Sequence, residues 1–196
     1  MKKLLILFII TIAILLTSKF AYAQTENVKP ASRVGGTIGL QLLADGGMDN
    51  GFGLNIFLHQ TISKRWFLSM NAGYHRHSWT MYSNGAKGEV IGNDIPFTLG
   101  INIFLATTGA RPYFGIEAGL LNKSAKGSVF DGGLENTIAQ SRGADLIIFS
   151  PIFGFSVPLS KNISLEGNVK FMVTGMSDGL GLRSTGINIG AAYLIP

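Results

Sequence analysis

Residues 94–122 read DIPFTLGINIFLATTGARPYFGIEAGLLN, and this stretch decides the fold. Every second residue from Ile95 to Leu105 is large and apolar, and small or polar residues stand between them, such as Thr98, Gly100 and Asn102. The same alternation continues through 112–122 after a short connection. Because side chains alternate between the two faces of a strand, this pattern predicts two neighbouring strands, each with one apolar face.

Alternation with a period of two recurs along most of the chain. Within residues 146–157, Ile148 and Ile152 interrupt the alternation of this sixth run, and Pro151 is unusual inside a strand. The pattern predicts an all-β fold of eight strands, at 34–44, 51–59, 65–78, 94–105, 112–122, 146–157, 163–174 and 185–195.

The composition of the polar faces distinguishes two architectures. A soluble β-sandwich buries its apolar faces and exposes charged ones, whereas a membrane barrel turns its apolar faces to lipid. Only 14% of the residues are charged, the 26 glycines all follow residue 23, and Gly, Ser, Thr and Asn dominate the polar faces. Small residues suit the interior of a narrow barrel. The complete absence of Cys excludes disulfides, thiolate metal sites and cysteine catalysis.

The connections between the runs also favour a membrane barrel. Segments 60–64, 106–111 and 158–162 are short and alternate with longer ones, as periplasmic turns alternate with external loops. The longest segment, 122–145, is expected to be a flexible external loop, with a binding surface as the alternative. Aromatic residues near the run ends are predicted to form interfacial girdles: Trp66, Tyr113 and Tyr193 at the inner rim, and Trp79 and Tyr82 near the outer rim.

The first 23 residues have the features of a cleavable signal peptide. Lys2 and Lys3 precede an apolar run of 13 residues, and Ala21-Tyr22-Ala23 forms a small-x-small cleavage site. The run is short for a membrane anchor, which needs about 20 apolar residues. We therefore predict a signal peptide at 1–23, a short N-terminal segment at 24–33 and a barrel domain at 34–196. Cleavage would leave 13 basic and 11 acidic residues, so a nucleic-acid partner is not indicated.

Three segments resemble the small OmpA/OmpX-like outer-membrane β-barrel family: LHQTISKRWFLSMNAGYH (58–75), IPFTLGINIFL with RPYFGIEAGL (95–105 and 111–120), and FGFSVPLSKNISLEGNVKF (153–171). The resemblance covers 34–196 and implies an eight-stranded antiparallel up-and-down transmembrane barrel in the bacterial outer membrane, inserted by the barrel-insertion machinery and monomeric. Family members often end on an aromatic residue, whereas this chain ends on Pro196. The resemblance implies adhesion, surface protection or envelope integrity, without choosing among them.

Four titratable residues are predicted to face the barrel interior: His59, Glu117, Glu166 and Lys170. Buried charges must be paired, so these residues are expected to form an internal structural cluster in which Lys170 neutralises the two glutamates. A gate or an ion path is the alternative. The structural interpretation is favoured because side chains fill the interior of an eight-stranded barrel.

Residues near the outer rim allow one catalytic alternative. His75 or His77 with Ser78 could form a hydrolase site that modifies lipid A, as some small outer-membrane barrels do. Strand parity separates this base from its nucleophile, and a His pair lacks a third metal ligand. Asp131-Gly132-Gly133 lacks the other ligands of a calcium loop. No catalytic, cofactor or metal site is therefore predicted.

Five basic residues are predicted to lie toward the outer rim, where they could contact lipopolysaccharide phosphates: Arg76, Lys87, Lys123, Lys126 and Arg142. The predicted partners are thus outer-membrane lipid and lipopolysaccharide. The predicted function is a non-enzymatic surface or structural role, with a lipid-modifying enzyme and a narrow pore as the alternatives.

Overall fold

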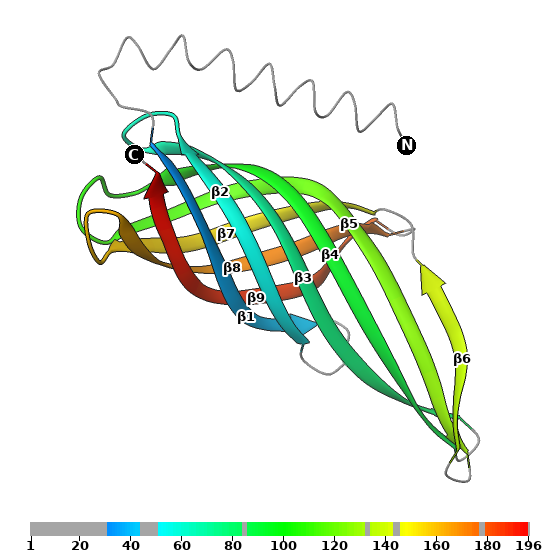
Figure 1. Cartoon of the computed structure of the whole chain (residues 1–196). Coiled ribbons are helices and arrows are strands. Elements are labelled where there is room, and N and C mark those ends of the chain that lie inside the picture. The colour runs from blue at the N-terminus through cyan, green and yellow to red at the C-terminus, as the bar shows by residue number, and fades with distance from the viewer. Residues whose placement is uncertain are drawn as a thin grey trace.

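The computed structural model describes residues 31–43, 51–83, 86–131, 134–142, 146–176 and 179–195; the predicted signal peptide lies outside them. No helix in these segments is long and apolar enough to cross a membrane. Nine strands run antiparallel to their neighbours (Figure 1): β1 (Ser32–Leu43), β2 (Gly51–Thr61), β3 (Trp66–Ser83), β4 (Ala86–Phe104), β5 (Arg111–Asp131), β6 (Leu134–Arg142), β7 (Leu146–Pro158), β8 (Ile163–Met176) and β9 (Gly179–Ile195).

Eight of these strands close into a barrel. Each pairs with its neighbour along the chain, β5 pairs with β7, and β1 pairs with β9 to complete the circle. In that last ladder Ser32 lies opposite Ile195, so both ends of the barrel domain lie at the same end of the barrel, beside the short turns (Figure 1). The expectation of an eight-stranded antiparallel barrel is confirmed.

The expectation of a flexible loop over 122–145 is wrong, because most of this segment is strand. β5 continues to Asp131, and β6 pairs with its outer part, from Ser124 opposite Arg142 to Asp131 opposite Leu134. Strands β3 and β4 are also longer than predicted and pair out to Ser83 and Ala86. Together β3, β4, β5 and β6 form a sheet that projects beyond one end of the barrel (Figure 1). We call this part the outer extension, residues 77–83, 86–93, 122–131 and 134–142.

The barrel surface is apolar and its interior is polar. Exposed large apolar side chains lie on every barrel strand, for example Ile38, Ile56, Ile147 and Ile187. Buried polar side chains alternate with them, so the predicted strand parity is correct. One predicted girdle residue is misplaced: Tyr113 is only 4% exposed and points inward, whereas Trp66 and Tyr193 are 42% and 47% exposed.

Two prolines lie inside strands, and each lies beside a gap in the ladder on one side of its own strand. Pro151 pairs with Ile116 of β5, while the β7–β8 ladder is interrupted between Phe149 and Ile152. Pro96 pairs with Leu121, and the β3–β4 ladder is interrupted at the same level. Since proline has no N–H to donate, each proline leaves one neighbouring strand without a bond. The isoleucines that blurred the sixth run both face the interior, where they join small apolar clusters.

Candidate functional site: the polar barrel interior

Among the described residues, three ion pairs cross the barrel interior at different levels. Lys170 Nζ lies 2.5 Å from Glu117 Oε2, Arg33 Nη1 lies 3.0 Å from Glu166 Oε1, and Arg183 Nη2 lies 2.8 Å from Asp94 Oδ2. They join β8 to β5, β1 to β8 and β9 to β4, which are not neighbours in the sheet. Each pair therefore ties together strands that no backbone ladder connects.

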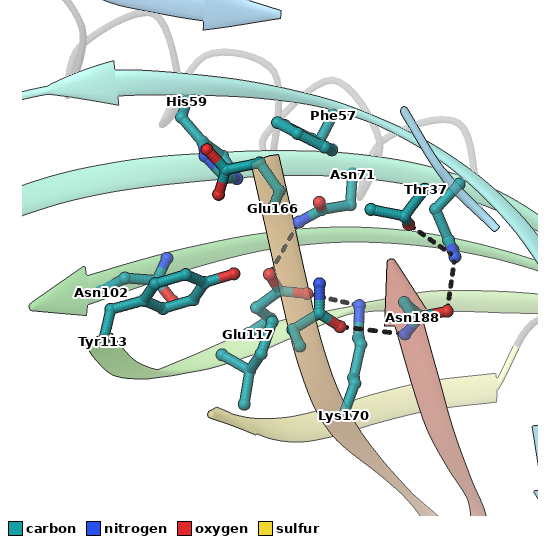
Figure 2. A pocket seen from close by; sticks show the side chains of 13 residues that line it. Thr37, Phe57, His59, Asn71, Asn102, Tyr113, Glu117, Glu166, Lys170 and Asn188 are labelled. Atoms are coloured by element: carbon teal, nitrogen blue, oxygen red, sulfur yellow. Dashed lines mark hydrogen bonds and ion pairs between the residues drawn. The ribbon is translucent and has the colours of Figure 1, made fainter. Parts of the chain in front are cut away.

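Glu117 is the most connected of these carboxylates. Its Oε1 accepts hydrogen bonds from Ser69 at 3.1 Å and Asn71 at 2.7 Å, and its Oε2 accepts from Thr98 at 2.8 Å and from Lys170. Figure 2 shows Asn71 and Lys170 reaching this carboxylate from different strands. With Glu117 only 2% exposed, these four donors compensate a charge that would otherwise be costly to bury.

Glu166 pairs with Arg33 and not with Lys170, so the single predicted cluster is divided in two. Its Oε1 accepts from Arg33, Ser156 and Ser164. The Arg33 guanidinium also lies 5.2 Å from the Phe104 ring centroid and 5.5 Å from that of Phe67. Arg33 falls within the predicted N-terminal segment at 24–33, one residue before the first apolar run.

His59 faces the interior, as predicted, but it belongs to an aromatic layer near the short turns. Its ring centroid lies 4.3 Å from that of Phe57 and 4.9 Å from that of Phe67. Phe67 in turn packs against Phe104 and Tyr113. Beside this layer lies a cavity of about 20 Å³, room for about one water molecule, lined by residues that include His59, Glu117, Glu166 and Lys170 (Figure 2).

The histidines of the catalytic alternative lie toward the outer end of the interior. His75 Nε2 lies 3.1 Å from Asn55 Oδ1, and His77 stacks on Trp79 with ring centroids 5.8 Å apart. His75 and His77 are each 5% exposed, and strand alternation places Ser78 on the opposite face. The described residues contain no group of three or more His, Cys, Asp or Glu able to hold a metal ion.

The five predicted lipopolysaccharide contacts do not share one face. Arg76 and Lys126 are exposed beyond Tyr74 and Ile95, which are among the outermost exposed apolar residues of β3 and β4. Lys123 is partly buried and pairs in register with Asp94, a buried residue of the interior face. The strand positions of Lys87 and Arg142 are defined, in β4 and β6, but their side chains lie outside the described set.

We expect Asp94→Asn to lower the free energy of unfolding by about 1–2 kcal/mol, because it weakens the two-pronged contact with Arg183. The Arg183 side chain is 16% exposed, so water compensates part of the loss. Urea unfolding in detergent micelles measures the change. Lys161→Ser, at an exposed turn of the other end of the barrel and outside this ion pair, is the control, and an equal loss in both variants would contradict the prediction.

A closed barrel with an apolar exterior and an ion-paired interior defines a transmembrane β-barrel protein. Residues 10–194 match the family described as "Outer membrane protein beta-barrel domain", and the chain belongs to this family. It is therefore an outer-membrane protein, as the resemblance to OmpA/OmpX-like barrels implied. No curated protein matches the chain.

Solved structures share the fold at low sequence identity. Ail, the attachment invasion locus protein of Yersinia pestis, matches with a TM-score of 0.54 at 10% identity, over 86% of this chain and 100% of Ail. Ail in complex with the heparin analogue sucrose octasulfate matches with 0.54 at 12% identity, over the same shares. The outer membrane protease OmpT of Escherichia coli matches with 0.51 at 8% identity, over 87% of this chain and 100% of OmpT.

Proposed function

We propose that this protein is a non-enzymatic barrel that displays the outer extension at the cell surface for interaction with a partner. The observation that carries the proposal is the continuation of β3, β4 and β5 beyond the apolar surface, with β6 added to their sheet. Strands need not extend beyond the lipid to anchor a barrel. A sheet of this length is an ordered surface, and surface segments that a rigid scaffold positions commonly carry function.

The nature of the partner is open to a direct test with glycans. The structure of Ail with a heparin analogue makes sulfated glycans a reasonable first probe, although the likeness supports the fold alone. Attachment is therefore the form of surface interaction that we propose first. Surface protection and envelope integrity are the alternative roles, and unchanged attachment in the experiment below would favour them.

The experiment shortens the outer extension without disturbing the barrel. Trp79 and Val90 are register partners, so deletion of 80–83 and 86–89 joins them through Asn84-Gly85 and keeps the strand parity. We expect the shortened protein to retain heat-modifiable gel mobility and to lose at least tenfold in attachment of expressing cells to immobilised sulfated glycan or host cells. Unchanged attachment with a folded barrel would contradict the proposal.

Two observations support the non-enzymatic assignment over the lipid-modifying alternative. Ser78 lies on the face opposite His77, so the candidate nucleophile and base are separated. Asp94 is engaged by Arg183 and is not free to orient a histidine. The structural likeness to OmpT makes a protease the second enzymatic alternative. Turnover of labelled lipid A or of labelled peptide by the purified barrel would overturn the non-enzymatic assignment.

We further propose that Arg76 and Lys126 contact lipopolysaccharide phosphates. Both are exposed just beyond the apolar surface, and Arg76 stands two residues after Tyr74 on the same face of β3. The Tyr74 hydroxyl donates to Asn93 at 2.6 Å. Tyrosine prefers the membrane interface, so the next polar residues reach headgroup depth. We expect Arg76→Ser with Lys126→Ser to reduce co-purified lipopolysaccharide at least twofold, while Lys161→Ser, at an exposed turn of the other end, leaves it unchanged.

A further inference from the structure

Two short turns at the same end of the barrel have the same sequence pattern. Residues 62–66, ISKRW, join β2 to β3, and residues 159–163, LSKNI, join β7 to β8. In each turn an apolar residue is followed by serine and then by lysine, and the fifth residue is again apolar. Lys64 and Lys161 therefore occupy equivalent positions in two turns that are far apart along the chain. We call these two segments the lysine turns.

The lysine turns also share their hydrogen bonds. In both, the backbone N–H groups of the first two residues donate to the carbonyl oxygen of the fifth, at 2.8 to 3.2 Å. The hydroxyls of Ser63 and Ser160 accept from the backbone N–H groups of the fourth and fifth residues, at 3.1 to 3.4 Å. Serine hydroxyls that bond the backbone locally stabilise a turn, so each lysine is presented from a defined backbone.

The positive charge at this end is not balanced by acidic residues. Five basic residues and no Asp or Glu occur in its described segments, 31–33, 60–66, 105–112, 158–164 and 193–195. Arg33 is in an ion pair, and the Arg111 guanidinium lies over an aromatic ring. The other three are exposed and take part in no ion pair among the described residues: Lys64, Arg65 and Lys161. The outer extension, by contrast, carries four basic and three acidic residues.

Exposed apolar side chains flank both lysines. Trp66, two residues after Lys64, is 42% exposed, and Leu159 and Ile163, two residues before and after Lys161, are 64% and 45% exposed. Tryptophan prefers the interface between lipid and water, so the neighbouring lysine reaches the depth of the headgroups. A lipid surface uses both the exposed apolar side chains and the charges beside them, whereas a soluble anionic polymer would use only the charges.

We propose that the lysine turns bind anionic phospholipid headgroups in the periplasmic leaflet of the outer membrane, since the short turns of such barrels face the periplasm. Lysine binds phosphate oxygens as a point charge, and Arg65 adds a second cation beside Lys64. Near an anionic lipid surface, each basic residue raises the affinity by a factor of about five. This site lies at the opposite end of the barrel from the outer extension, so it does not depend on the surface role proposed above.

The test is quenching of Trp66 fluorescence by phospholipids with brominated acyl chains, with the complete barrel in vesicles. The chain has two tryptophans, so Trp79→Phe leaves Trp66 as the single reporter beside the first lysine turn. We expect brominated phosphatidylglycerol to quench Trp66 at a mole fraction about fivefold lower than brominated phosphatidylcholine does. Lys64→Ser with Arg65→Ser should abolish this difference.

A second reporter tests the other lysine turn. Ile163→Trp, combined with Trp66→Phe and Trp79→Phe, places the single tryptophan two residues after Lys161, and Lys161→Ser should abolish the lipid preference there. Arg76→Ser with Lys126→Ser is the matched control, because it removes two exposed charges from the other end of the barrel. This control should leave the difference at Trp66 unchanged. Heat-modifiable gel mobility verifies that each variant is folded.

Four results would overturn the proposal. One is equal quenching by the two lipids at either reporter in a barrel that keeps its lysines. Another is a preference at Trp66 that survives Lys64→Ser with Arg65→Ser. An equal loss in the control would mean that net charge, and not the turns, sets the preference. Loss of the preference on addition of inorganic phosphate at constant ionic strength would identify a site for free phosphate. If the serine pair does not fold, Lys64→Gln with Arg65→Gln decides in the same way.

Discussion

Lys170→Met is expected to destabilise the barrel by about 3–5 kcal/mol, because it leaves the Glu117 carboxylate buried without its cation. Methionine retains most of the length of the lysine side chain, so the change removes charge more than volume. Glu117 would keep its bonds from Ser69, Asn71 and Thr98, but neutral donors compensate only part of a buried charge. Urea unfolding in micelles and the temperature at which gel mobility changes both measure the loss.

The double variant Lys170→Met with Glu117→Gln provides the control. It removes both charges, so it should recover a large part of the stability lost in the single variant. Single-channel recording separates a structural pair from a gate: conductance should not change between the wild-type and the variant barrels. Unchanged stability in Lys170→Met would contradict a structural role for the pair.

Gly190→Ala is expected to cost about 3 kcal/mol, the upper end of what overpacking usually costs. Gly190 faces the interior at the ladder between β1 and β9, opposite Thr37. A Cβ atom there would collide with the backbone carbonyl oxygen of Gly36 and would lie 2.7 Å from Thr37 Cα. These are main-chain atoms of the neighbouring strand, so no side-chain rotation relieves the contact. The midpoint of urea unfolding measures the effect.

Gly127→Ala is the matched control, since it makes the same change within a strand. A Cβ at Gly127 meets only Val90 Cγ2, at 3.6 Å, which is an ordinary contact. We expect this variant to unfold within about 0.5 kcal/mol of the wild-type protein. Equal midpoints for the two glycine variants would mean that the β1–β9 backbones separate without cost.

The sequence alone predicted the barrel well and the outer extension poorly. Lipid on one side and a packed interior on the other impose strict alternation, which is why all eight barrel strands were found. Beyond the apolar surface that constraint ends, so β6 and the outer parts of β3, β4 and β5 show no clear alternation. Short connections were the overlooked signal: the sequences Asn84-Gly85 and Gly132-Gly133, both common in hairpins, separate consecutive strands along the chain.

The interior residues were predictable by face but not by partner. Parity identified Glu117, Glu166 and Lys170 as inward-facing, yet the partner of each depends on how far the strands are staggered around the barrel. A sequence read strand by strand does not contain that shear. Arg33 was overlooked because it stands one residue before the run at 34–44, and extending that run by one residue along its parity would have found it. Asp94 lies inside the run at 94–105, where its parity with Thr98 and Asn102 places it on the polar face, but it was not recognised as an interior charge.

The ladder between β1 and β9 differs from the others in sequence separation. The remaining barrel ladders join strands that follow one another closely along the chain. In the β1–β9 ladder Ser32 pairs with Ile195, so the two partners are separated by nearly the whole length of the barrel domain. Local hairpins form quickly, while a contact of such separation carries a larger entropic cost and forms slowly. We therefore expect the β1–β9 ladder to form after the local hairpins. The bond from Arg33 of β1 to Glu166 of β8 reaches across β9, so it links the strands on both sides of β9 where the barrel closes.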